Sequence, residues 1–190
     1  MSKLENKKIA IIATDGFEQS ELFSPLEALK KAGAKVDIIS LKPGEIQGVE
    51  HGEKGKSAKV DQEIEHADIG EFSGILIPGG LYNPDALRQN ERVLSFVRGA
   101  FERKLPVASI CHGPQVLISA GVVTGRKMTG YPSIQKDLEN AGATVSDEEV
   151  VVDQGLVTSR SPDDLEAFNK KIVEEFCEGK HDRQAKSIAA

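Results

Sequence analysis

The segment PVASICHGPQVLISAG, residues 106–121, contains the most informative pattern in this chain. Its first five residues are a short, mostly aliphatic run that predicts a buried strand, and a helical pattern returns after Gly113. A strand therefore gives way to a helix around Cys111, with small Ser109 two residues before it and Gly113 two residues after it. This is the spacing of a nucleophile elbow, with sulfur in place of the usual serine oxygen.

The same alternation extends outward along the chain. Aliphatic runs predict strands at residues 7–14, 35–40, 74–77 and 106–110, and a hairpin at residues 150–153 and 156–159. Stretches with helical spacing of leucine, valine and phenylalanine lie between them. The polar excursion at residues 42–68 reads as a small β hairpin that leaves the main sheet. This order predicts one open three-layer α/β sandwich, with a mostly parallel sheet covered by helices on both faces.

Length and composition limit the classes of protein that remain. We expect a single domain over residues 1–190, with a compact core at about residues 7–178 and a polar tail at residues 179–190 that frays. Lys and Arg number 24 against 30 Asp and Glu, and this net charge of −6 argues against nucleic-acid binding. The apolar run at residues 9–13 is too short for a signal-peptide core or a membrane span.

The two cysteines, Cys111 and Cys177, do not make a disulfide framework, so we expect a cytoplasmic protein with reduced thiols. Ligands of open α/β sheets bind beyond the carboxyl ends of the strands. That rule directs attention to the strand ends at residues 15–18, 79–85 and 111–113.

Cys111 has two interpretations. Free cysteines are often inert and buried. At an elbow, however, the free N–H groups at the start of the following helix favour a thiolate, which predicts a reactive sulfur. Cys177, beside Phe176 in the last predicted helix, lacks this context and is expected to be a structural or surface thiol.

Three further residues follow the ends of predicted strands, and each has a structural or a functional interpretation. Glu18 is either a carboxylate that complements a helix N-terminus or a protonated group that donates a hydrogen bond to Cys111. Gly80 belongs either to an ordinary turn or, through its N–H, to an oxyanion hole shared with the N–H of His112. Asp85 looks first like part of a helix start.

The other histidines show no ligand spacing. His51, His66 and His181 lie in polar or charged contexts and are expected to be solvated. The sequence has no Cys-x-x-Cys, no His-x-x-x-His and no glycine-rich phosphate loop, so we expect neither a metal nor a cofactor.

Residues 106–142, together with GILIPGG at 74–80 and DGFEQSEL at 15–22, closely resemble the PfpI intracellular cysteine protease family. That family belongs to the PfpI/ThiJ superfamily, which includes the Parkinson-associated deglycase. The resemblance runs from about residue 9 to residue 176. It implies a flavodoxin-like sandwich and assembly into dimers or rings of dimers.

The resemblance also assigns roles to particular residues. It implies a nucleophile at Cys111, a neighbouring base at His112 and a sulfur-bonded carboxyl at Glu18. It implies an oxyanion-hole glycine at Gly80 and a pocket tyrosine at Tyr131.

In the most similar family members, a carboxylate after the Pro-Gly-Gly turn reaches the histidine across a subunit interface. The matching residue here is Asp85, which is shorter than the family's glutamate and lies one residue further from the glycine pair. Asp85 is thus the expected acid of a Cys-His-acid triad, supplied across a homo-oligomer interface.

Three hypotheses compete. In the first, Cys111 attacks a carbonyl carbon of a small dicarbonyl, a glycated side chain or a peptide, as in a stress-protective protease, deglycase or glyoxalase. In the second, the protein is a redox-responsive stress protein or chaperone whose Cys111 is oxidised with little turnover. The third, a glutamine amidotransferase, needs a downstream His-x-Glu pair, and the only later histidine is His181 in GKHDRQ.

Overall fold

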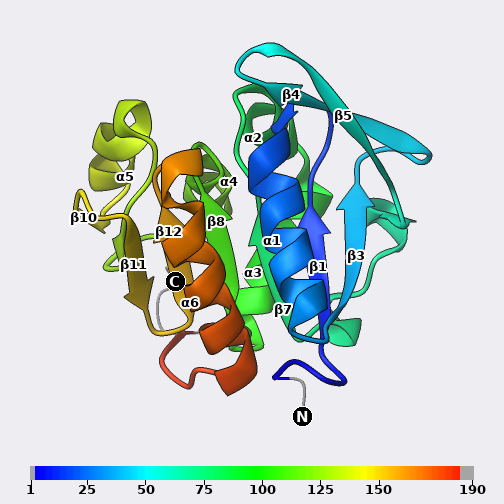
Figure 1. Ribbon diagram of the computed structural model, residues 1–190. Helices are drawn as coiled ribbons and strands as arrows, with labels where there is room; N and C mark the ends of the chain where they lie inside the picture. Colours follow the sequence, from blue (N-terminus) through cyan, green and yellow to red (C-terminus); the bar gives the residue numbers. More distant parts are fainter. Residues whose placement is uncertain (1–2, 185–190) are drawn as a thin grey trace.

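The computed structural model describes residues 3–184 (Figure 1). Its strands are β1 (Lys8–Ile12), β2 (Phe17–Glu18), β3 (Lys35–Ser40), β4 (Glu45–Glu50), β5 (Glu53–Lys59), β6 (Gln62–Glu63), β7 (Gly74–Ile77), β8 (Val107–Ile110), β9 (Lys127–Met128), β10 (Thr144–Val145), β11 (Val150–Asp153) and β12 (Leu156–Ser159). Its helices are α1 (Gln19–Lys31), α2 (Tyr82–Leu87), α3 (Glu91–Glu102), α4 (Pro114–Ala120), α5 (Gln135–Asn140) and α6 (Leu165–Glu178). Short 3-10 turns are η1 (Ile64–His66), η2 (Ile69–Glu71), η3 (Pro132–Ile134) and η4 (Pro162–Asp164).

Within the described residues, seven strands form the central sheet in the order β11-β12-β8-β7-β1-β3-β6. Neighbouring strands are parallel except for β11 and β12, which form the predicted antiparallel hairpin. Because β1, β7 and β8 are adjacent and parallel, their carboxyl ends lie at one edge of the sheet. The three strand ends singled out in the sequence are therefore brought together.

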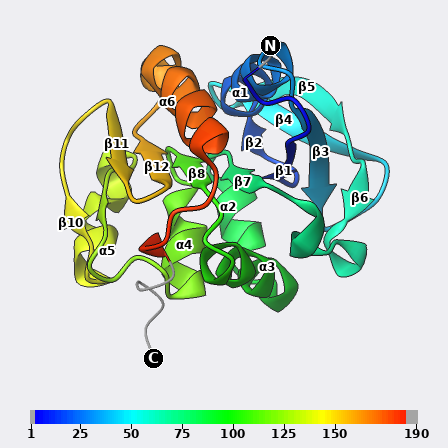
Figure 2. The ribbon, with the colours of Figure 1, turned by 90° about the horizontal axis from the view of Figure 1, so that it is seen from below.

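The sheet is covered on both faces, which explains why its central strands β1 and β7 are almost entirely aliphatic. In β1, Ile9 and Ile11 pack into one buried cluster, and Ala10 and Ile12 pack into the other. Figure 2 shows α1 and α6 on one face of the sheet and α3 and α4 on the opposite face. The flavodoxin-like three-layer sandwich is confirmed.

The polar excursion after β3 is also confirmed as a hairpin. Strands β4 and β5 pair antiparallel, and β4 pairs with β2 to make a separate three-stranded sheet. This places β2, and hence the start of α1, beside the hairpin. The chain then returns to the edge of the central sheet as β6.

The expected fraying of the tail is wrong for residues 180–184. The His181 N–H donates to the Lys104 carbonyl at 2.9 Å, and Gln184 is fully buried with its side-chain amide donating to the Leu105 carbonyl. These two hydrogen bonds tie the segment to the loop between α3 and β8, a long-range contact that composition does not reveal. Residues 185–190 of the expected tail lie outside the described residues.

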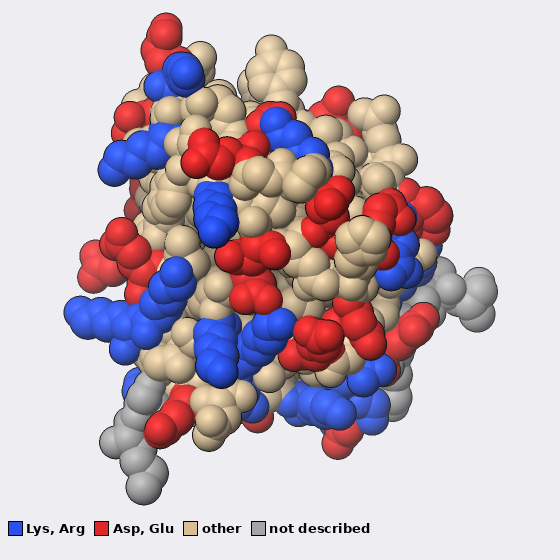
Figure 3. Space-filling model, turned by 90° about the vertical axis from the view of Figure 1, so that its right-hand side faces the viewer, with Lys and Arg blue, Asp and Glu red and all other residues tan. Residues whose placement is uncertain are grey.

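The surface carries charges of both signs. On the face in Figure 3, Lys and Arg side chains are interspersed with Asp and Glu side chains. No helix among residues 3–184 combines the length and the apolar character needed to cross a membrane.

Candidate functional site

Cys111 lies on a sharp backbone turn between β8 and α4. Its φ is 61°, in the left-handed region that non-glycine residues rarely occupy. The turn leaves no room for larger neighbours, because a Cβ atom on Gly113 would come within 2.5 Å of the Ser109 Oγ atom. The small residues that predict the elbow are therefore required by the geometry.

Two backbone donors surround the sulfur. The N–H groups of Gly80 and His112 both form hydrogen bonds with the Cys111 side chain. Gly80 has a φ of 85°, and a Cβ atom there would lie 2.3 Å from the Gly16 carbonyl oxygen. Only glycine brings this N–H so close to the sulfur, and the arrangement has the donors of an oxyanion hole.

The carboxyl group beside the sulfur is that of Glu21, whereas the sequence pointed to Glu18. Glu21 is fully buried in the first turn of α1, forms a hydrogen bond with Cys111, and accepts one from the Gly79 N–H at 2.9 Å. Glu18 precedes the helix, is half-buried, and accepts a 3.5 Å hydrogen bond from the Ser20 hydroxyl.

A signal for Glu21 was present in the helical spacing. The buried face of α1 includes Pro25 and Leu29, and Glu21 lies four and eight residues before them. A carboxyl group on the apolar stripe of a helix is unusual and therefore informative.

Burial changes the ionisation of this pair. Burial raises the pKa of Glu21 to about 8, so its carboxyl group holds a proton at neutral pH. Burial also raises the pKa of the Cys111 thiol, the neighbouring Glu21 adds to the rise, and the N–H groups of Gly80 and His112 oppose it. The elbow donors predict a thiolate at Cys111, but the side chain is only 6% exposed. Desolvation therefore favours the protonated thiol over the thiolate in the resting site.

His112 contacts the sulfur directly. Its Nδ1 atom lies 3.2 Å from the Cys111 Sγ atom, and its Nε2 atom lies 3.1 Å from the Ser133 Oγ atom. The ring stacks on Tyr131 with centroids 4.5 Å apart. Burial lowers the pKa of His112, so the neutral imidazole that can accept a proton is favoured. Ser133 was missed in the sequence because a serine after a proline carries no signal for this contact.

Asp85 does not reach His112 within one chain. It is exposed in α2, and its backbone carbonyl accepts a 2.9 Å hydrogen bond from the side chain of Gln89. Ser133 takes the position at Nε2 that an acid would occupy in a triad.

A cavity of about 550 Å³ opens over the sulfur. It is lined by Glu18, Glu21, Val49, His51, Gly52, Gly80, Leu81, Tyr82, Cys111, His112, Tyr131, Ser133, Ser161, Pro162 and Asp163. Tyr131 is therefore a pocket residue, as the resemblance implies. The lining comes from β2 and the start of α1, from the segments that follow β7, β8, β9 and β12, and from the β4–β5 hairpin.

One group of side chains among the described residues has metal-ligand spacing, and it lies outside this cavity. Glu175, Glu178 and His181 offer ligand atoms within 4.8 Å of one another. The expectation of a solvated His181 is wrong, because its side chain is only 16% exposed and its Nε2 atom lies 3.3 Å from Glu175. The cavity itself offers a thiol, two imidazoles and carboxyl groups for acid–base and nucleophilic chemistry.

Similarity to known proteins covers most of this chain. The model of the DJ-1/PfpI family matches residues 7–175. Over 168 residues the chain is 49% identical to YraA of Bacillus subtilis, whose name assigns it provisionally to the cysteine proteases; the match covers 88% of this chain and 97% of YraA. It is 46% identical to General stress protein 18 of Bacillus subtilis and to Protein/nucleic acid deglycase 2 of Escherichia coli, each covering 88% of this chain and 96% of the relative.

Solved structures give the same result. Drosophila melanogaster DJ-1beta superposes with a TM-score of 0.83 at 28% identity, covering 96% of this chain and 95% of that one. A two-domain protein from Anabaena variabilis, with DJ-1/ThiJ/PfpI-like and ferritin-like domains, gives 0.85 at 38% identity and covers 89% of this chain and 48% of that one. The chain belongs to the DJ-1/PfpI family.

Proposed function

We propose that the protein is a cysteine-dependent hydrolase or lyase that acts on carbonyl compounds. The observation that carries this proposal is the Cys111 Sγ atom on its elbow in the cavity, 3.2 Å from His112 Nδ1 and with two N–H donors around it. The relatives named as a cysteine protease and as deglycases support the same class of chemistry.

The chemistry begins with a neutral pair. As Sγ attacks the carbonyl carbon, the thiol proton passes to Nδ1 of His112, and the carbonyl electrons move onto the oxygen. The N–H groups of Gly80 and His112 stabilise that oxygen. His112 then returns the proton, to the leaving group of a peptide or glycated amine or to the oxygen of a hemithioacetal. A thiol that ionises only during attack is consistent with the raised pKa of Cys111.

The test compares the two cysteines. We expect Cys111→Ala to abolish methylglyoxal consumption, release of amine from glycated substrate, and peptide cleavage, whichever of these the wild type performs. Cys177→Ala is the matched control, because Cys177 is exposed on α6 and outside the cavity. Unchanged activity of Cys111→Ala in all three assays would exclude the mechanism.

A second candidate function is redox sensing, favoured by the protonated carboxyl beside the sulfur. Peroxide would oxidise Cys111 to the sulfenic and then the sulfinic acid, with water as the reduced product, and Glu21 could donate a hydrogen bond to the added oxygen. Intact mass after mild peroxide treatment tests this. We expect Cys111 to oxidise before Cys177 and the order to depend on Glu21, with Glu21→Leu losing the selectivity.

Assembly into dimers or rings of dimers stays a prediction, as do the supply of Asp85 from a second copy and a cytoplasmic location. Sedimentation of wild type and Asp85→Asn, combined with their activities, tests the first two. If Asp85 completes a triad across an interface, Asp85→Asn lowers activity without changing the mass of the assembly.

A further inference from the structure

We propose that the cavity selects substrates that carry a positive charge, and that Glu18 and Asp163 recognise it. This proposal rests on the proposed function for its reacting carbonyl, and it adds the class of substrate: a carbonyl compound bearing an ammonium or guanidinium group. Glu18 and Asp163 approach the cavity from the start of α1 and from η4.

The ionisable side chains of the cavity are unbalanced in charge. Glu18, Glu21 and Asp163 line it, and no Lys or Arg is among the described residues that do so. Glu21 is fully buried and holds its proton at neutral pH, so it contributes little charge. The negative potential therefore comes from Glu18 and Asp163. The charge of Glu18 reaches the bottom of the cavity, since it adds to the effect of burial in raising the pKa of Glu21.

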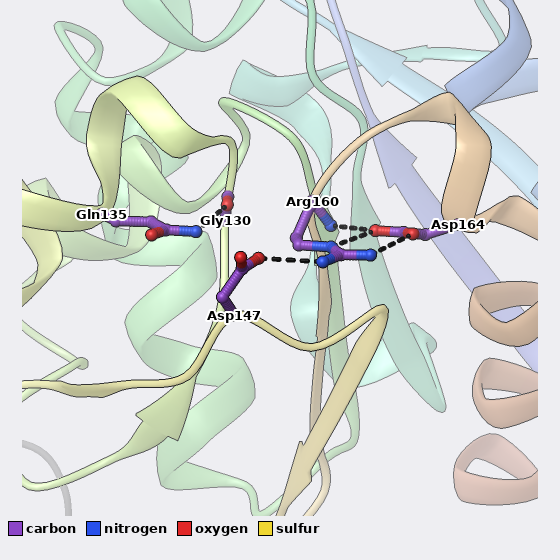
Figure 4. Close-up of polar contacts among 5 residues, drawn as sticks. All are labelled: Gly130, Gln135, Asp147, Arg160 and Asp164. Atoms are coloured by element: carbon purple, nitrogen blue, oxygen red, sulfur yellow. Dashed lines mark hydrogen bonds and ion pairs between the residues drawn. The ribbon is translucent and has the colours of Figure 1, made fainter.

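Arg160, which is next to the lining residue Ser161 in the sequence, does not cancel this negative potential. Arg160 precedes the lining loop, but two of its nitrogens bind the Asp164 carboxylate at 2.9 Å each and a third binds Asp147 at 2.8 Å. Figure 4 shows the guanidinium held between these two carboxylates. Within residues 3–184, Asp163 has neither a side-chain hydrogen bond nor an ion pair, so its charge is left for a ligand.

The aromatic lining suits the same ligand. Tyr82 and Tyr131 both line the cavity, and Tyr82 is 74% exposed. Tyrosine rings attract ammonium and guanidinium groups placed over their faces. Clefts lined by one sign of charge raise the local concentration of oppositely charged molecules roughly 10- to 1000-fold. Both features favour a cation and disfavour an anion.

The test measures charge selection at Cys111 without requiring turnover. Three methanethiosulfonate reagents, carrying a trimethylammonium group, a neutral methyl group and a sulfonate, are reacted with the Cys177→Ser protein at pH 7.5. Each transfers its thio group to Sγ and releases methanesulfinate, and intact mass gives the rate. After each rate is divided by that for free 2-mercaptoethanol, we expect the cationic reagent to react about 10-fold faster than the anionic one.

Single and double variants show which residues produce the preference for the cationic over the anionic reagent. We expect Glu18→Gln and Asp163→Asn each to lower the ratio several-fold, and the double variant to bring it near 1. Asp137→Asn is the matched control, because Asp137 is exposed on α5 and does not line the cavity. It removes one negative charge and should leave the ratio unchanged. High salt should lower the wild-type ratio, because ions screen exposed charges.

A wild-type ratio near 1, or a ratio that survives in the double variant, overturns the proposal. Substrate preference supplies the second readout: methylglyoxal hemithioacetals of thiocholine, 2-mercaptoethanol and 3-mercaptopropionate share a reacting centre and differ in charge. We expect kcat/KM to fall in that order, and the reverse order would also overturn it. If all three are inert while the reagent ratio holds, the glyoxalase form of the proposed function fails and the charge selection stands.

Discussion

The Nε2 atom of His112 lies 3.1 Å from the Oγ atom of Ser133, on the side of the ring opposite the sulfur. A neutral imidazole that accepts the thiol proton at Nδ1 must carry its hydrogen at Nε2. That N–H then donates to Ser133, so the serine selects the tautomer that can act as a base. The Tyr131 ring stacks on the imidazole of His112 and so holds its orientation. Ser133 is therefore a positioning residue for His112.

Replacing this serine should weaken the base without removing it. We expect Ser133→Ala to lower kcat/KM by roughly 5- to 10-fold, since one hydrogen bond contributes about 1 kcal/mol. The loss of an acceptor at Nε2 also disfavours imidazolium, so the acidic limb of the pH–rate profile should move to lower pH. Ser133→Thr keeps the hydroxyl and should restore both quantities. An unshifted pH profile in Ser133→Ala would contradict the positioning role.

Glu21 should make stability depend on pH. Its pKa is raised by burial from an ordinary value near 4.5 to about 8. The folded state thus holds a proton that the unfolded state releases, so the stabilisation is complete below about pH 4.5 and is lost as pH rises through 8. We expect Glu21→Gln to remove this decline. Urea unfolding of both proteins at pH 5, 7 and 9 measures it, and parallel curves would show that Glu21 titrates normally.

The same carboxyl group should control the reactivity of the thiol at alkaline pH. Above about pH 8 Glu21 is ionised, and its charge opposes formation of the Cys111 thiolate. We expect Glu21→Gln to react with iodoacetamide faster than wild type above pH 8, by a ratio that grows with pH. The measurement is made in the Cys177→Ser background, so that one thiol is followed. A ratio independent of pH would show that the two groups do not interact.

Gly80 offers a test of the backbone donor. Alanine at Gly80 would be strained by the positive φ and would also place Cβ 2.3 Å from a backbone oxygen of Gly16. Gly125 has a φ of 75° and nothing within 4 Å of its Cβ position, so alanine there introduces the backbone strain without a steric clash. We expect Gly125→Ala to cost about 1–2 kcal/mol and to leave activity intact.

Gly80→Ala should cost at least twice as much and should abolish activity, because the N–H that faces the sulfur must move. Thermal unfolding, in which 1 kcal/mol corresponds to about 2–4 °C for a chain of this size, together with kcat, measures both effects. Equal losses in the two variants would argue against a special role for Gly80.

Local patterns were sufficient to predict most of the sheet. The runs at Lys35–Ser40, Gly74–Ile77, Val150–Asp153 and Leu156–Ser159 are strands with the predicted bounds, because short aliphatic runs between turn residues favour buried strands. The elbow at Cys111 could also be predicted from the sequence, since the sharp turn requires small neighbouring residues.

The choice between Glu18 and Glu21, the raised pKa of the thiol and the contact between His112 and Ser133 could be decided only by the tertiary structure. Each depends on how α1, β7, β8 and the loop after β9 meet at one edge of the sheet. Which residues can form strands, helices and a reactive turn was predictable from the sequence, because those preferences are local. Which carboxyl faces the sulfur, and how much water remains there, follow from packing between segments far apart in the chain, and desolvation has no local signature.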